Sequence, residues 1–99
     1  MKKWADYLIS AVQYNFQHTH IVKVYRHLDT GDNVASLNII NRMIVVNDLN
    51  LGKTYKTIFK NNKDQWTQGE DIRLIGSTGF ITTDPNCTTR DNLVNLPEF

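Results

Sequence analysis

The stretch NIINRMIVVNDLNLGK, residues 38–53, decides the fold because it carries helix signals in a chain that otherwise favours strands. Asparagine is a preferred N-cap residue, and Asn41 stands directly before an apolar run. Glycine is common just past the last helical residue, and Gly52 occupies that place. The two signals bracket roughly ten residues, which predicts one short helix.

The side chains between these two caps fit a helix better than a strand. The residues at helical spacing are Met43, Val46, Leu49 and Asn50, with Ile44 and Val45 widening the apolar side. The β-branched residues among them would also suit a strand. Asn47, Asp48 and Asn50 suit a strand poorly, so the helix is the favoured interpretation.

Runs of β-branched and aromatic residues on both sides of this helix predict strands. The five expected strands are residues 7–14, 20–28, 53–59, about 71–75 and 80–84. The polar break NFQHT, residues 15–19, is short, so we expect the first two strands to form an antiparallel hairpin. Regular alternation places Val22 and Val24 on the core side of the second strand.

Together these elements predict an α+β fold, with residues 1–99 forming a single domain. We expect a small, strongly curved antiparallel sheet or partial barrel of about five strands, with the one helix across its open side. In the third strand, alternation puts Tyr55, Thr57 and Phe59 on one face. The residues on its other face are Lys56, Ile58 and Lys60. The turn KNNKDQ, residues 60–65, follows.

The chain ends in the apolar stretch RDNLVNLPEF, and we expect this tail to pack on the core. Leu93, Leu96 and Phe99 would plug an open edge or end of the sheet, and Pro97 would limit the freedom of the unfolded tail. Local backbone bonds at the turn into the tail are expected from Asp91 and Asn92. Deleting residues 93–99 should then lower the melting temperature by many degrees. The alternative is a tail that binds a partner.

Composition excludes several classes of protein. Apolar residues make up 40% and charged residues 21% of the 99 residues, as in an ordinary globular protein. The net charge of +1 predicts no strong attraction to nucleic acid or to an anionic membrane. The sequence contains no run of about eighteen apolar residues, so we expect no membrane span. The opening MKKWADYLISAV resembles a signal peptide superficially, but Asp6 and Gln13 interrupt it. The single Cys87 excludes an internal disulfide and fits a cytoplasmic location.

Few residues suggest chemistry. His18 and His20 could share a metal on one strand face, but His27 has the wrong parity to complete the site. Cys87 has Arg90 near it but no helix start that would activate a thiolate. The adjacent Glu70 and Asp71 would face opposite ways in a strand. We therefore expect no catalytic residue, no metal and no cofactor.

Candidate partner-binding residues are Trp4, Lys53, Lys56, Lys60, Lys63 and Arg73. The segment KTYKTIFKNNK, residues 53–63, has four lysines and two aromatic residues. Small β-domains bind single-stranded nucleic acid with such residues, because lysines neutralise phosphates and aromatic rings stack on bases. An amphipathic strand with a buried aromatic face and a solvated lysine face predicts the same string. Trp4 would be a contact residue if its indole is exposed, and Trp66 is expected to pack over the sheet end.

Several motifs together resemble an uncharacterised bacterial, archaeal and phage-borne family, domain-of-unknown-function family 3892. They are ADYLISAVQYN with HIVKV, a helix followed by GKTYKT, W with GEDI, and FITTDPN with RDNLVNLPEF. The resemblance covers nearly the whole chain, and its most specific part is the ending. It implies a shape and a domain boundary, and no activity, cofactor or catalytic residue.

We therefore expect a non-enzymatic interaction module that binds another protein. The phage-borne members of the resembled family suggest a narrower form, a mobile-element protein that inhibits a host or defence factor. The alternative is a small β-domain that binds single- or double-stranded nucleic acid. An enzyme using His20 or Cys87 is a third hypothesis, and an unpaired edge strand could form a homodimer.

Overall fold

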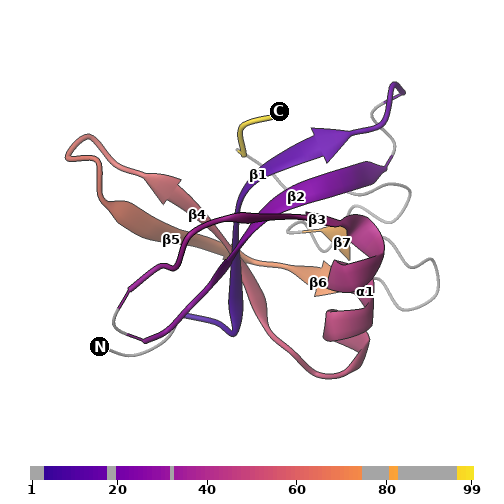
Figure 1. Cartoon of the computed structure of the whole chain (residues 1–99), viewed down its shortest axis with the longest axis horizontal. Helices are drawn as coiled ribbons and strands as arrows, with labels where there is room; N and C mark the ends of the chain where they lie inside the picture. Colours follow the sequence, from indigo (N-terminus) through magenta and orange to yellow (C-terminus); the bar gives the residue numbers. More distant parts are fainter. Residues whose placement is uncertain (1–3, 18–19, 32, 75–80, 83–95) are drawn as a thin grey trace.

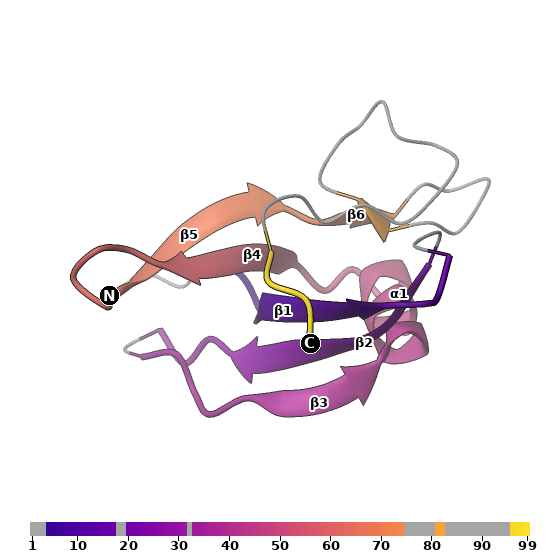
Figure 2. The same cartoon turned by 90° about the horizontal axis from the view of Figure 1, so that it is seen from above.

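The computed structural model describes residues 4–17, 20–31, 33–74, 81–82 and 96–99. The elements in these ranges are β1 (Tyr7–Tyr14), β2 (Ile21–Leu28), β3 (Asn38–Asn41), α1 (Arg42–Asn50), β4 (Tyr55–Lys60), β5 (Trp66–Asp71), β6 (Arg73–Leu74) and β7 (Ile81–Thr82). Five strands form one sheet in the order β3-β2-β1-β4-β5, and β6 pairs with β7 separately (Figures 1 and 2). The expected α+β class with one helix is therefore confirmed for the described part of the chain.

The main sheet is mixed and open, so two expectations about it were wrong. β1 pairs antiparallel with β2, but it pairs parallel with β4 over residues 7–9. The chain passes through β3 and α1 before it returns as β4, and such a crossover allows a parallel pair. The additional strand β3 pairs with β2 and extends the sheet. Because β3 and β5 lie at opposite edges, the sheet is not strongly curled or closed into a partial barrel.

Two β-bulges change the alternation of side chains in the β1–β2 hairpin. Register shifts leave Ser10 in β1 and Val22 in β2 as the extra residues. At a bulge, the side chains that follow change to the opposite face of the sheet. Ile21 and Val24 are therefore buried, whereas Val22 is 41% exposed. The prediction that Val24 faces the core is confirmed, and the same prediction for Val22 was wrong.

Helix α1 begins and ends where its capping residues predicted. The side-chain Oδ1 of Asn41 accepts a hydrogen bond from the backbone N–H of Ile44 at 3.3 Å. Gly52 follows the C-cap residue Leu51 with a φ of +86°, a conformation that glycine adopts without steric cost. No helix among the described residues is long and apolar enough to cross a membrane.

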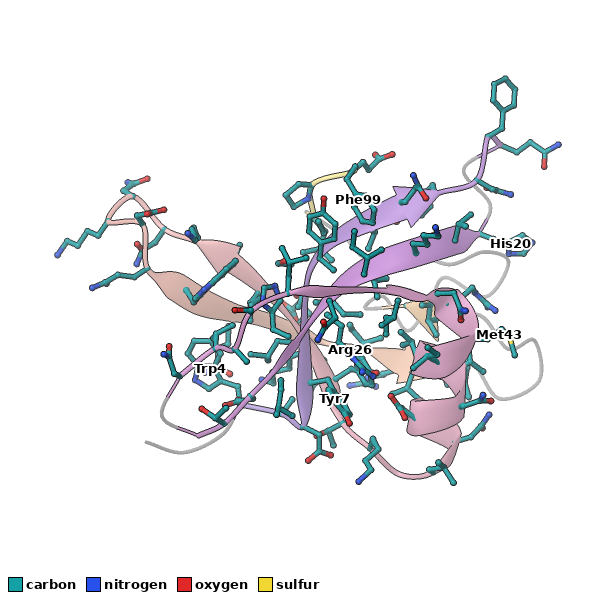
Figure 3. The ribbon with its side chains drawn as sticks, viewed as in Figure 1. Trp4, Tyr7, His20, Arg26, Met43 and Phe99 are labelled. Carbon is teal, nitrogen blue, oxygen red and sulfur yellow. The ribbon has the colours of Figure 1, made fainter. Side chains whose placement is uncertain are left out.

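The buried side of α1 is narrower than the sequence predicted. Val45 and Val46 are buried, and Leu49 packs partly against the same core. Met43 was expected on this side but is 56% exposed, and it lies on the outer side of the helix in Figure 3. A helix of nine residues has only about two turns and packs one face against the sheet. Met43 lies outside that face.

Strand β5 (Trp66–Asp71) begins earlier than expected, and Ile72 separates it from β6. Gly69 made this segment look like a turn. The structure explains the glycine: a Cβ there would lie 2.3 Å from the Oγ1 atom of Thr57. That oxygen accepts a hydrogen bond of 2.9 Å from the backbone N–H of Glu70, so the side chain cannot easily move away.

Strand β4 is buried on both faces, which corrects its predicted alternation. Tyr55 and Thr57 are buried as expected, but Ile58 is also fully buried. Phe59 was expected in the core and is 45% exposed. The buried residues of the larger cluster are Ile9, Val12, Ile21, Val24, Val45, Val46, Tyr55, Ile72 and Ile81. A second cluster of Ala5, Leu8 and Ile58 is covered by Trp4, Val34 and Trp66.

A polar clamp of Arg26, Asp48 and Tyr55 ties α1 to the sheet. The Tyr55 hydroxyl donates to the Asp48 carboxylate at 2.5 Å. Arg26 bridges to that carboxylate at 3.1 Å and donates to the Tyr55 oxygen at 3.2 Å. The Arg26 guanidinium also lies 4.3 Å from the centre of the Tyr7 ring, and both residues lie between β1 and α1 in Figure 3.

This clamp predicts a loss of stability at alkaline pH. Burial, and next the hydrogen bond to Asp48, raise the pKa of the Tyr55 phenol above its ordinary value. The folded protein therefore holds this proton more tightly than the unfolded chain, whose tyrosines ionise near pH 10. The contribution is fully present below about pH 10 and declines above it, by up to about 1.4 kcal/mol per pH unit.

Urea unfolding at several pH values between neutrality and pH 11 checks this expectation. In Tyr55→Phe there is no phenol at position 55 to ionise, so the free energy of unfolding of this variant should fall less steeply above pH 10 than that of the wild type. Two parallel curves would contradict the role assigned to Tyr55.

Candidate functional site

An open, mostly apolar groove of about 610 Å³ lies on the sheet face opposite α1. Tyr25 lines the groove, while the neighbouring Val24 points into the core that α1 covers. The lining residues are Ser10, Ala11, Tyr25, His27, Leu37, Phe59, Lys60, Trp66 and Pro97. They come from β1, β2, the segment before β3, β4, β5 and the carboxy-terminal tail, so only the assembled sheet forms this groove.

Aromatic side chains line both halves of the groove. Tyr25 stacks on Phe99, with their ring centres 4.0 Å apart. Figure 3 shows Phe99 above the β1–β2 hairpin, on the side away from Arg26 and Tyr7. Across the groove, Phe59 is 45% exposed and Trp66 is half-buried. A ligand in the groove would therefore contact rings on both sides.

A serine and a histidine form the polar part of the groove. The Ser10 Oγ and His27 Nε2 atoms lie 2.8 Å apart, and His27 Nδ1 lies 2.8 Å from the carbonyl oxygen of Ala35. The neutral tautomer that satisfies both contacts donates from Nδ1 to Ala35 and accepts at Nε2 from Ser10. The Trp66 ring meets the His27 imidazole edge-on at 5.4 Å.

Sequence reasoning did not identify the Ser10–His27 pair. His27 was considered only as a third ligand for His18 and His20, and regular alternation argued against that. The bulge at Ser10 brings its side chain to His27. Two bulges interrupt the alternation of buried and exposed residues, so the sequence alone does not indicate that these two side chains share a face.

The tail forms one wall of the groove by pairing with β1. The Val12 N–H donates to the Pro97 carbonyl at 2.9 Å, and the Phe99 N–H donates to the Val12 carbonyl at 3.0 Å. β4 accompanies β1 only over residues 7–9, so this later part of β1 has a free edge that the tail takes (Figure 2). Leu96 packs on the larger core cluster.

This geometry agrees with a tail that packs on the domain, as the sequence predicted for Leu96, Pro97 and Phe99. Phe99 is nevertheless 37% exposed, so it covers Tyr25 and does not enter the core. Asp91, Asn92 and Leu93, whose roles in the tail were also predicted, lie outside the described residues.

The candidate partner-binding residues do not gather at one place. Lys56 donates to the Gln68 side chain at 2.9 Å and lies 3.6 Å from an Asp71 carboxylate oxygen. Lys60 is the one candidate that lines the groove; its Nζ lies 3.4 Å from Asp64. The exposed candidates outside the groove are Lys53, Lys63 and Arg73.

Trp4 is partly buried, because it packs against the cluster of Ala5, Leu8 and Ile58. Its side chain is therefore only partly available for contact with a partner. His20 is exposed at the end of the β1–β2 hairpin, and its backbone N–H bonds to Asn15. The other two residues considered for chemistry, His18 and Cys87, lie outside the described residues.

The fold and groove define an α+β domain with a mixed five-stranded sheet, one helix and an aromatic-lined face. No family model, no curated protein and no solved structure matches the chain. The resemblance to domain-of-unknown-function family 3892 stays a prediction that depends on the motifs given above.

Proposed function

We propose that this domain is a non-enzymatic binding module that holds a segment of another protein in its groove. The observation that carries the proposal is the groove itself, in which Tyr25, Phe59 and Trp66 surround an apolar space. Exposed apolar groups that converge on one surface mark protein interaction sites. In the narrower form that the phage-borne members of the resembled family suggest, the partner is a host or defence factor in a bacterial cell.

The charges near the groove support a protein partner over nucleic acid. Lys56 and Lys60 of the basic segment lie beside Asp71 and Asp64, which offset part of their charge. Binding to a phosphate backbone requires several cations along one path. Among the residues that line the groove, the single basic side chain is Lys60, apart from the imidazole of His27.

One observation favours nucleic acid as a second candidate function. The Lys60 Nζ lies 5.1 Å from the centre of the half-buried Trp66 ring, and a lysine beside an aromatic ring suits a stacked base and its phosphate. A flat fluorescence-anisotropy titration at low salt, against single- and double-stranded oligonucleotides, would dismiss this function.

The Ser10–His27 pair is assigned a structural role in this proposal. Both ring nitrogens of His27 already have partners within the chain, on Ser10 and on Ala35. The hydrogen bonds join β1, β2 and the segment before β3, which holds the groove in shape.

Selection of peptides from a random display library on the immobilised domain tests the proposal. Leu37 is 45% exposed and lines the groove, so Leu37→Asp should abolish binding by the selected peptides and leave the fold intact. Leu51→Asp is the matched control, because Leu51 is 77% exposed and does not line the groove. A library without any specific binder, or binders that tolerate Leu37→Asp, would contradict the proposal.

A further inference from the structure

We propose that the groove recognises a proline-rich segment in the polyproline II conformation, with an acidic residue beside the prolines. This inference rests on the proposed function and specifies the chemistry of the ligand. It is carried by three features of the groove: an occupied strand edge, two polar groups on its aromatic rings, and one partly exposed lysine.

The occupied strand edge argues against a ligand that adds a strand to the sheet. Strand addition requires free backbone N–H and C=O groups along an edge. At the β1 edge beside the groove these groups belong to Val12, and they are bonded to Pro97 and Phe99 of the tail. A ligand that lies along the β1 side of the groove must therefore be held by side chains.

A polyproline II segment suits such side-chain recognition. It has no internal hydrogen bonds, so its carbonyl groups remain available as acceptors, and its conformation is largely formed before binding. The Trp66 indole N–H and the Tyr25 hydroxyl have no hydrogen-bond partner among the described residues, and both side chains line the groove. These two groups can donate to ligand carbonyls while proline rings pack on the aromatic faces.

The charge at the groove specifies the acidic residue. The Lys60 side chain is 47% exposed, and its ion pair with Asp64 is also exposed. Such a surface pair contributes little stability, so Lys60 can exchange Asp64 for a ligand carboxylate at low cost.

The test follows the Trp66 indole N–H by two-dimensional ¹H–¹⁵N NMR in Trp4→Phe, a variant with one indole. The probe is a synthetic ten-residue peptide with repeated Pro-x-x-Pro spacing and one glutamate. The comparison probes are the same peptide with alanine for every proline, a valine–threonine peptide with one glutamate, and a ten-residue oligo-dT. We expect a saturable downfield shift of the indole proton with the proline peptide and none with the others.

Variants then separate the hydrogen bond from the apolar contact. Trp66→Phe keeps a ring but removes the N–H, and should weaken binding about fivefold, the effect of one hydrogen bond. Tyr25→Phe should weaken binding similarly and keeps the inference testable if Trp66→Phe does not fold. Leu51→Asp should bind like the wild type.

Four outcomes would overturn the inference. Equal binding of the alanine peptide would remove the requirement for proline, and preference for the valine–threonine peptide would indicate another peptide class while leaving the proposed function standing. Preference for oligo-dT would replace the protein partner with nucleic acid. If no probe binds but display selection still yields groove-dependent peptides, the proline inference alone is contradicted.

Discussion

Replacing Asp29 with alanine is expected to lower the free energy of unfolding by about 3 kcal/mol, because a buried charged acceptor of several hydrogen bonds is lost. The Asp29 Oδ2 atom accepts from the Trp4 N–H at 2.6 Å and the Ala5 N–H at 3.4 Å. Its Oδ1 atom accepts from the Gly31 N–H at 2.9 Å. Asp29 is only 3% exposed, so water cannot easily replace these bonds.

Thermal unfolding measures this effect. For a domain of this size, about 3 kcal/mol corresponds to a fall in melting temperature of roughly 12–24 °C. Asp71→Ala is the matched control: the Asp71 side chain is 63% exposed and, among the described residues, forms an ion pair only with Lys56, so its loss should cost less than about 1 kcal/mol. If the melting temperatures of the Asp29→Ala and Asp71→Ala variants coincide, Asp29 does not organise this end of the domain.

Deleting residues 96–99 is expected to lower the free energy of unfolding by about 2 kcal/mol, and the melting temperature by roughly 10 °C. The deletion removes the two backbone bonds to Val12, the packing of Leu96 on the core and the ring stack of Phe99 on Tyr25. Part of the gross loss returns as chain entropy, because four ordered residues are no longer fixed.

Point variants show which part of the tail contributes. Phe99→Ala removes the ring stack and should cost about 1 kcal/mol. Phe16→Ala removes an equally large side chain that is fully exposed, and should leave the melting temperature unchanged. A truncated protein that melts like the wild type would show that the tail only rests on β1 and does not stabilise it.

The elements whose signals are local were predictable from the sequence. β1 was predicted over residues 7–14, as in the structure, and the helix between Asn41 and Gly52 was predicted to within one residue of its observed end at Asn50. Asn41 both ends β3 and caps α1, so no turn separates Ile39 and Ile40 from the helix. β3 was missed for this reason. β5 was placed too late because Gly69 was interpreted as a turn residue. The structure requires a glycine there because Thr57 of the neighbouring strand approaches closely, and the sequence does not show this contact.

The candidate site was less predictable than the fold. Of the residues proposed for partner binding, only Lys60 lines the groove, together with Pro97 of the tail. The lysines were conspicuous in the sequence because they cluster, but Asp71 of β5 and Asp64 of the β4–β5 turn lie beside two of them. Ser10 and His27 gave no signal, because a bulge aligned them.

The sequence by itself determined the α+β class, the hairpin, the capped helix and the apolar character of the tail, because each depends on residues close together in the chain. Only the tertiary structure decided the parallel pairing of β1 with β4, the open sheet and the groove. These features join segments distant in sequence. Which distant segments meet depends on how the whole chain buries its apolar side chains, and no local pattern records that choice.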